Sequence, residues 1–422
     1  MCLLALTSKF LVKTFGNAIL AFIISPITLL WGLIQPLLPL KKQPMRTILH
    51  KSDGYLKSGE MCLVLGCPGA GCSTFLRTIA NRREDFGAVS GEVLYAGMDA
   101  HEMAKFYKGE VAYNEEDDRH IATLTVGQTL NFALSTKTPG PNGRLPGVSR
   151  KEFDKEVQNT LLRMLNIAHT KNTLVGDEFV RGVSGGERKR VSIAEMMATR
   201  ARVQCWDNST RGLDASTALD FVKCLRIMTD ILGQTTFVTL YQAGEADVPH
   251  TPEALENAFQ ASKYNVEMQH ERASYKKYME TDKSDQETFR AAVVADKKKG
   301  VSKKSPYTQG FIGQVTALVK RQFIQKLQDK FQLYTSLALS TALALVIGGA
   351  FFNLPPTSAG AFTRGSVIFV ALLTTCLDAF QEMPMQMLGR PILHKQTNYG
   401  MYRPSAIAIA NTLADIPFSA VR

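Results

Sequence analysis

The sequence has little cysteine, and the cysteines it has are scattered. Seven are spread over 422 residues without the paired spacing that binds a metal ion. Their odd number and scatter argue against a disulfide scaffold and for reduced thiols in a cytosol-facing domain. Basic patches interleaved with aromatic residues are also missing. The net charge of +11 therefore does not indicate a nucleic-acid partner, and none is expected.

Charge itself is absent from two long stretches. Residues 14–40 and 333–352 carry no charged side chain, and roughly 18 such residues are enough to cross a bilayer. The first stretch follows two lysines, as a signal anchor would, but Pro26 and Pro36 interrupt it. It is either a true span or, as we favour, an interfacial or packed segment that leads into the next domain.

The second of these stretches begins a region of apolar helices. Candidate spans cover about residues 333–352 and 367–388, and a third apolar helix begins at about 405–421. Lysines and arginines crowd before the first span and after the second, which predicts cytosolic flanks joined by an extracellular hairpin. This basic collar accounts for much of the positive charge, and membrane lipid is the partner that it indicates.

Residues 46–246 alternate short β-rich runs with helical runs, as an α/β domain does. The predicted strands are Met61–Leu65, Gly91–Tyr95, Glu110–Tyr113, Val203–Asp207 and Thr235–Leu240. The predicted helices are Ser73–Arg82, Phe153–Leu165 and Gly186–Thr199. Residues 247–306 differ in kind, because they are polar, end in lysine runs and contain helix-forming stretches but no strand.

A lysine is missing from a glycine-rich loop. Gly66–Thr74 reads Gly-Cys-Pro-Gly-Ala-Gly-Cys-Ser-Thr and lies between a buried strand and a helix, which is the context of a phosphate-binding loop. Its glycines let backbone N–H groups turn inward around an anion, and the helix N-terminus adds its dipole. Because Cys72 holds the position of the loop lysine, this stretch alone leaves a second interpretation open: a glycine-rich turn between strand and helix.

A second constellation lies downstream of this loop. Val183–Arg190 reads Val-Ser-Gly-Gly-Glu-Arg-Lys-Arg and is followed by a helix and by the strand that ends at Asp207. A serine and two glycines at a helix start can present N–H groups and a hydroxyl to a phosphate held by a facing subunit, although alone they also suit an ordinary helix cap. In this order the stretches resemble the signature loop and Walker B strand of ATP-binding cassette (ABC) proteins, and Arg211–Asp214 resembles their D-loop.

The resemblance is closest to one group of these proteins. Cys72, the run Cys205–Asp214 and Tyr241-Gln242-Ala243 look like the amino-terminal cassette of the fungal pleiotropic-drug-resistance (PDR) group of G-type ABC transporters. The fold class implied is an α/β P-loop NTPase, the ABC cassette, followed by an all-α transmembrane region. The family implies ATP-driven multidrug efflux of hydrophobic compounds at the plasma membrane, with the cassette in the cytoplasm.

The resemblance also implies cofactors, partners and site residues. ATP and Mg²⁺ are the implied cofactors, and a second cassette with its membrane half is the implied partner, because two composite ATP sites form between two cassettes. Ser73 and Asp207 are implied to hold Mg²⁺ indirectly, and Asp214 belongs to the D-loop. The implied nucleotide-binding residues are Gly66, Pro68, Gly69, Ala70, Gly71, Cys72, Ser73, Thr74 and Asp207, and the signature residues are Ser184, Gly185, Gly186 and Glu187.

Four positions depart from the pattern of a hydrolytic site, so no catalytic residue is intact. Cys72 replaces the lysine, which removes roughly 1–4 kcal/mol of attraction for phosphate. Asn208 replaces the glutamate that would act as base, and an amide cannot accept a proton. Tyr241 stands in place of the γ-phosphate histidine, and Glu116 in place of the Q-loop glutamine. The sequence predicts a site that binds nucleotide without hydrolysing it, and a signature that completes a partner's catalytic site.

The chain also differs from the family in extent. After Ala246 the strand pairs that close the cassette sheet are replaced by linker-like sequence, so a block is predicted to be missing. The expected organisation is an apolar segment at 1–45, a cassette at 46–246, a basic linker at 247–306, and a connecting helix with an incomplete membrane domain at 307–422. The chain is expected to be the membrane-embedded, ATP-binding part of an exporter. The alternative is a non-transporting, membrane-tethered nucleotide-binding regulator or a non-functional gene fragment.

Overall fold

The structure is a computed structural model, and it describes residues 46–66, 69–240, 252–352 and 358–419. By its internal contacts the chain divides into a short unit that ends at Ile48 and a second unit from Leu49 to Arg422. The elements discussed below all belong to the second unit. The apolar stretch 14–40 and the predicted γ-phosphate contact Tyr241 lie outside the described residues.

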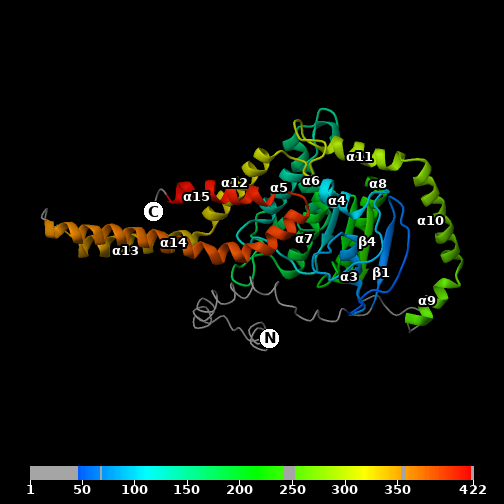
Figure 1. The fold of residues 1–422 in the computed structure, drawn as a ribbon, viewed down its shortest axis with the longest axis horizontal. Helices are drawn as coiled ribbons and strands as arrows, with labels where there is room; N and C mark the ends of the chain where they lie inside the picture. The colour runs from blue at the N-terminus through cyan, green and yellow to red at the C-terminus, as the bar shows by residue number, and fades with distance from the viewer. Residues whose placement is uncertain (1–45, 67–68, 241–251, 353–357, 420–422) are drawn as a thin grey trace, which may run out of the picture. The chain divides into compact units, whose positions relative to one another are not determined.

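Four parallel strands form the central sheet, in the order β1-β4-β3-β2 (Figure 1). They are β1 (Met61–Leu65), β2 (Val111–Asn114), β3 (Val203–Trp206) and β4 (Thr235–Leu240). Leu65 at the end of β1 is level with Leu240 at the end of β4, and Trp206 at the end of β3 is level with Asn114. The carboxyl ends of the strands therefore meet at one edge of the sheet, which is where open α/β sheets bind ligands.

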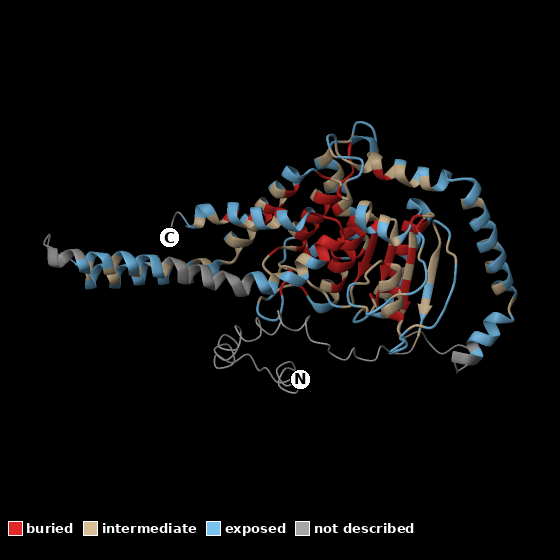
Figure 2. Ribbon diagram, viewed as in Figure 1, coloured by how far each residue is buried: buried red, intermediate tan, exposed pale blue. Residues whose placement is uncertain are grey.

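Successive side chains along each strand point to opposite faces of the sheet, so the strands contribute to two apolar cores, one on each face. Cys205 contributes to the core with α3 and α4, and the next residue, Trp206, contributes to the larger core with the remaining cassette helices. The buried residues gather in the sheet and the helices beside it (Figure 2). The helices concerned are α3 (Cys72–Ile79), α4 (Ala100–Phe106), α5 (Val126–Lys137), α6 (Arg150–Met164), α7 (Gly185–Thr199) and α8 (Ala215–Leu232). Both faces are covered by helices, as a parallel sheet requires.

The prediction of a strand at Gly91–Tyr95 is wrong, whereas the other four predicted strands exist to within one residue at either end. At this place the described backbone forms only an isolated bridge between Tyr95 and Met98. Gly91, Ala96 and Gly97 have φ values of 94°, 47° and 77°, so the chain turns through left-handed conformations and cannot stay extended. Tyr95 is buried all the same, in the core under α3 and α4.

The predicted cassette helices exist, and their capping residues explain where they begin. α6 begins at Arg150, because Ser149 accepts a hydrogen bond from the Glu152 N–H. α7 begins at Gly185 after the capping residue Ser184. α3 ends at Ile79, three residues before the predicted end, and Asn81 just beyond it has a left-handed φ of 58°.

The polar linker packs against the cassette at several points. It contains α9 (Pro252–Gln260), α10 (Lys263–Thr281) and α11 (Ser284–Asp296). On α10, Glu271 pairs with Lys57 at 2.6 Å, and Tyr275 stacks on Tyr55 with ring centroids 4.7 Å apart. On α11, Arg290 pairs with Glu102 of α4 at 2.8 Å. These contacts are exposed, so each contributes little on its own.

Four helices follow the linker: α12 (Phe311–Gln328), α13 (Lys330–Ala350), α14 (Ser358–Asn398) and α15 (Pro404–Ser419). Among the described residues, α13 is the one helix that is long and apolar enough to cross a membrane, judged by length and composition. Within α14, residues 362–374 form a shorter apolar stretch. Tyr399 and Tyr402, between α14 and α15, are buried in the larger cassette core, so this region is anchored to the cassette.

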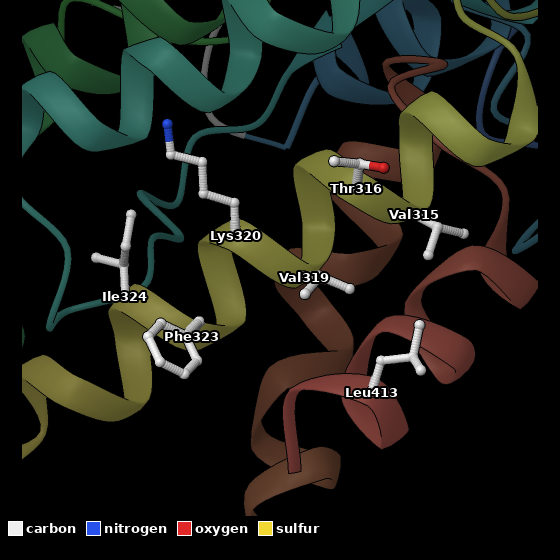
Figure 3. Close-up of a pocket in the computed structure, with 7 residues that line it drawn as sticks. All are labelled: Val315, Thr316, Val319, Lys320, Phe323, Ile324 and Leu413. Atoms are coloured by element: carbon white, nitrogen blue, oxygen red, sulfur yellow. The ribbon is translucent and has the colours of Figure 1, made fainter. Parts of the chain in front are cut away.

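A cavity of about 530 Å³ lies along α12 (Figure 3). It is lined by apolar side chains of α12, among them Val319 and Phe323, and by Leu413 of α15. Lys320 is the one lining residue that carries a charge. Because every lining residue belongs to α12 or α15, this cavity is separate from the carboxyl edge of the sheet and is not the nucleotide site.

Candidate nucleotide site

The predicted phosphate-binding loop leaves the carboxyl end of β1 and enters α3. Gly69 and Gly71 have φ values of 89° and 95°, a left-handed backbone that glycine adopts without strain. Gly71 is the N-cap of α3, no side chain caps this helix, and no acidic residue lies in its first turn. A helix end of this kind suits an anion. Pro68, a predicted nucleotide-binding residue, lies outside the described residues.

Cys72 occupies the lysine position, and its side chain turns into the loop. The residue is buried, and its Sγ lies so close to Gly66 that a Cβ added there would be 2.5 Å from the sulfur. The same added Cβ would be 3.2 Å from that of Ala70. The loop therefore closes tightly around a small side chain that carries no fixed positive charge, where the resemblance implies a cation.

Asp207, the predicted magnesium residue, follows β3 and is buried at the same sheet edge. Its Oδ2 accepts a hydrogen bond from the Tyr113 hydroxyl at 2.6 Å, and its Oδ1 accepts one from Thr239 Oγ1 at 3.0 Å. Burial, together with the neighbouring charge of Asp207, raises the pKa of Tyr113, so this hydroxyl keeps its proton and donates. The two donors hold the carboxylate in one orientation.

Sequence reasoning did not identify Tyr113 or Thr239 as site residues. Thr239 connects the ends of two strands, because its hydroxyl contacts Asp207 and also accepts from the Asn208 N–H at 2.8 Å. Both residues are buried and polar, and each is one residue from the end of a strand that neighbours β3. Their position near the carboxyl end of a strand could have identified them as site residues, because the carboxyl ends of parallel strands meet at one edge of the sheet.

Two of the four departures from the hydrolytic pattern contact each other. Asn208, at the position of the general base, donates from Nδ2 to Glu116 Oε1 at 3.0 Å. The same oxygen of Glu116 accepts from the guanidinium of Arg211 in the D-loop, which forms an ion pair with it. Asn208 has a left-handed φ of 44°. An amide and a cation thus contact the Glu116 carboxylate, and the amide stands at the position where the resemblance implies a carboxylate base.

The predicted signature loop lies at the N-terminus of α7. Ser184 and Glu187 form a reciprocal capping box: the Ser184 N–H donates to Glu187 Oε2 at 2.8 Å, and the Glu187 N–H donates to Ser184 Oγ at 3.3 Å. His169 Nε2 contacts Glu187 Oε1 at 2.9 Å. The hydrogen bond from Ser184, and then the one from His169, lower the pKa of Glu187. A Cβ built on Gly185 would meet no described atom within 4 Å, whereas one built on Gly186 would lie 3.6 Å from the Gly212 carbonyl oxygen. Asp214 caps α8.

The donor set of the loop fits a nucleotide phosphate and Mg²⁺. Ser73 lies in the first turn of α3 and supplies a hydroxyl, and Asp207 supplies a buried carboxylate at the same edge of the sheet. No atom lies within 4 Å of a Cβ built on Gly69, so the outer side of the loop is open to a ligand. Oxygen donors of this kind suit Mg²⁺, which commonly takes one or two carboxylates and the phosphates of its nucleotide.

Two family models match the chain. The family described as ABC transporter matches residues 49–211, and the one described as ABC-2 type transporter matches residues 313–422. The first match covers the phosphate-binding loop, the signature loop and Asp207. The second covers α12 to the end of the chain.

Several curated proteins align with nearly the whole chain. ABC multidrug transporter I of Aspergillus fumigatus is 43% identical over 98% of this chain and 32% of its own length. Protein SNQ2 of Saccharomyces cerevisiae is 36% identical over 96% of this chain and 30% of its own length. ABC transporter G family member 17 of Dictyostelium discoideum is 35% identical over 96% of this chain and 32% of its own length. The chain thus spans about a third of the length of these relatives.

Two further findings come from these comparisons. The alignment with ABC multidrug transporter I runs over 478 positions, more than the 422 residues of this chain, so it includes positions for which this chain has no counterpart. Among solved structures, the ATP-binding cassette MJ0796, a dimer with ADP and Pi, covers 48% of this chain and 84% of its own at 20% identity and a TM-score of 0.39.

Proposed function

The chain belongs to the ABC transporter family, with a cassette followed by an ABC-2 type membrane region, and on this premise we propose that it is the ATP-binding, membrane-embedded part of an exporter of hydrophobic compounds. Relatives that are named as multidrug transporters support the substrate class. The proposed location is the plasma membrane, with the cassette in the cytoplasm. The proposed partners are a second cassette with its membrane half, the membrane lipid and the exported compound.

The cassette's own site is proposed to hold ATP without hydrolysing it. The observation that carries this proposal is the contact between Asn208 and Glu116: an amide occupies the position of the base, and it donates a hydrogen bond where a base would accept a proton. Cys72 agrees with this, because the loop lacks the cation that would stabilise charge on the γ-phosphate. The structure does not describe Tyr241, so its part rests on the sequence alone.

The residues that would hold the nucleotide are the ones predicted from the resemblance. Backbone N–H groups from Gly69 to Thr74 would bind the phosphates, and Ser73 and Asp207 would hold Mg²⁺, directly or through water. Bound Mg²⁺ supplies positive charge that neutralises the β- and γ-phosphates. Ser184 and the helix start behind it are proposed to face the ATP of the partner cassette, where a lysine and a glutamate would perform the hydrolysis.

A second candidate function, a membrane-tethered regulator that does not transport, is favoured by the open edge of the sheet. Among the described strands, β1 has a neighbour on one side only. Leu63 and Leu65 of this strand are 54% and 57% exposed, and Ile231 of α8 is 75% exposed. These exposed apolar side chains, and an alignment that is longer than the chain, support the absence of the strands that would close the sheet. A cassette without those strands would need another protein to cover its exposed apolar surface. Sequencing the transcript across codons 240–250 separates the two functions, because recovered strands would remove the case for the regulator.

The proposed function is tested by measuring nucleotide binding and turnover on the same preparation of the full chain in lipid nanodiscs. We expect a fluorescent ATP analogue to bind in the presence of Mg²⁺ and turnover to stay far below the 1–10³ s⁻¹ that is typical of enzymes. Asn208→Ala should change neither measurement, because Asn208 neither binds phosphate nor accepts a proton. Turnover at ordinary rates that Asn208→Ala leaves intact would show that the site is hydrolytic by another route.

Asn208→Glu is expected not to restore turnover. The new carboxylate would lie next to that of Glu116, and two adjacent carboxylates repel each other. Arg211 offsets only part of this, since its guanidinium is largely exposed. The double variant Asn208→Glu, Glu116→Gln removes the repulsion and is the matched control. Turnover in the single variant well above the wild-type level would contradict this expectation.

A further inference from the structure

The helix α12 has one face that packs on the cassette and another that does not. On the packed face Gln314 and Leu318 are buried, and Leu318 belongs to the larger core. On the other face Ile312, Phe323 and Leu327 are 82%, 39% and 47% exposed. Their spacing places these three side chains on one side of the helix. α12 therefore turns an apolar face away from the cassette.

This apolar face continues onto α15. Ile409, Leu413 and Ile416 of α15 are exposed large apolar residues. The rings of Phe323 on α12 and Phe418 on α15 lie with their centroids 5.6 Å apart, so the two helices share one apolar surface. The cavity of about 530 Å³ is the groove in this surface, and its volume is that of a small-molecule site, which is typically about 300–1,000 Å³.

The cavity offers a ligand one charged group. Lys320 is exposed and makes no hydrogen bond or ion pair with any residue that the structure describes. Asp415 on α15 is paired with Lys326, so its charge is already balanced. The hydroxyl of Thr316, the other polar lining group, donates to the Ile312 carbonyl of its own helix at 2.9 Å. These groups suit a ligand that is apolar over most of its length and negatively charged at one end.

The cavity lies beside the start of the apolar span. α12 ends at Gln328, and α13, which is long and apolar enough to cross a membrane, begins at Lys330. Lys320, Lys326 and Lys330 lie before the apolar part of this span, which indicates its cytosolic end. The cytosolic leaflet is the one that carries anionic phospholipids. A ligand of the chemistry described above is therefore present where the cavity opens.

We propose that the cavity between α12 and α15 binds one anionic phospholipid of the cytosolic leaflet. The lipid phosphate contacts the ammonium of Lys320, and one acyl chain lies along Val319, Phe323 and Leu413. Figure 3 shows the Lys320 side chain extending away from Leu413, so the headgroup and the chain occupy opposite ends of the cavity. The proposal rests on the membrane location that is part of the proposed function, and it requires neither bound nucleotide nor transport.

The net charge of the headgroup decides which lipid is preferred. Phosphatidylcholine and phosphatidylserine both carry a phosphate, but the choline ammonium balances it, whereas phosphatidylserine keeps a net negative charge. One lysine near a membrane surface increases the binding constant for an anionic lipid roughly fivefold. A compact ammonium suits this role, because it binds a phosphate as a point charge. A sterol or an uncharged compound gains no such advantage from Lys320.

The proposal is tested by the quenching of a tryptophan in the cavity by brominated lipids. Phe323→Trp places the reporter among the lining side chains, and Trp31→Phe leaves Trp206, which is buried in the cassette, as the only other tryptophan. The full chain is reconstituted in nanodiscs of phosphatidylcholine with a minority of phosphatidylserine, and one of the two lipids is brominated at a time. Mole for mole, brominated phosphatidylserine should associate with the reporter roughly fivefold more strongly. Added salt should lower this ratio.

Lys320→Gln is expected to bring the ratio to about one and to leave quenching by brominated phosphatidylcholine unchanged. Lys330→Gln is the matched control, because it removes an exposed lysine at the start of α13 that does not line the cavity. This variant should keep most of the preference for phosphatidylserine. An equal loss in both variants would show a diffuse attraction between the basic residues and the membrane surface, and would overturn the site.

Other occupants of the groove give different results. A helix of a partner protein would shield the reporter from both brominated lipids, and a lipid bound without regard to charge would quench it equally in either form. Either result overturns the proposal. Tyr334→Trp, at an exposed position on α13, is the reference, because a helix in the bilayer must be quenched there. Failure at Tyr334 counts against the membrane location itself, whereas quenching there without a preference at Phe323 counts against the lipid site alone.

Discussion

Cys72→Lys is expected to tighten nucleotide binding by about 1–3 kcal/mol, or roughly 5- to 150-fold in Kd. The phosphate-binding loop retains its two left-handed glycines and an uncapped helix start, so the backbone part of the site is in place. What it lacks is a positive charge near the β- and γ-phosphates. Because the gain is electrostatic, it should shrink as salt is added. Titration with a fluorescent ATP analogue at low and high salt measures both effects.

The control for this variant is Cys72→Met, which is longer than cysteine and carries no charge. The thiol of Cys72 is close to Gly66, so any longer side chain must leave the interior of the loop and run along its outer side. Cys72→Met should therefore bind nucleotide no better than wild type. If methionine and lysine tightened binding equally, the position of the Cys72 side chain inside the loop, and not the absence of a positive charge, would be what weakens nucleotide binding.

Four of the strands were predictable from the sequence, because they are short apolar runs, two of them followed directly by motif residues. β1 precedes the glycine loop and β3 precedes Asp207, and the parallel pairing of the strands places both motifs at the same edge of the sheet. The failure at Gly91–Tyr95 has a local cause. Val93 and Tyr95 are apolar residues at every second position, as in a strand. The left-handed backbone at Ala96 and Gly97 instead reverses the chain direction in a turn.

The partners of the site residues were not predictable, because they come from strands far apart in the sequence. Tyr113 and Asp207 are brought together only by the register of β2 on β3, and Thr239 by that of β4 on β3. The same limit applies to the buried ion pair between Lys395 and Glu195, which are 200 positions apart in the sequence and 2.6 Å apart in the structure. Hydrophobic periodicity places a helix, but it does not say which polar side chain on that helix meets which partner.

The departures at Glu116 and Asn208 make physical sense together. A glutamine at position 116 and a glutamate at 208 could also form one hydrogen bond, with the roles of donor and acceptor exchanged. In this chain the acid and the amide have changed places, and Arg211 adds a cation on the side of the acid. The hydrogen bond between the two positions is therefore kept, with an amide at the position where the resemblance implies a carboxylate base.

Trp206→Ala is expected to destabilise the cassette by about 3–5 kcal/mol, the usual cost of emptying a buried aromatic site. Trp206 has no exposed surface, and its ring meets Phe221 of α8 edge to face with centroids 5.3 Å apart. It lies at the end of β3, level with Val238 and Asn114, so its loss loosens both neighbouring strands. For a domain of this size the thermal midpoint should fall by roughly 10 °C, measured by circular dichroism.

Trp206→Phe separates volume from hydrogen bonding at the same position. The indole Nε1 is buried and has no hydrogen-bond partner among the described residues, so phenylalanine removes a donor that the core does not use. This variant should lose much less stability than alanine does. Because Asp207 follows directly, the cavity left by alanine should also let its carboxylate move away from Tyr113 and Thr239 and weaken Mg²⁺-dependent nucleotide binding. A phenylalanine variant as unstable as the alanine one would mean that the indole nitrogen has a partner, and that the strand end depends on polar contacts more than on packing.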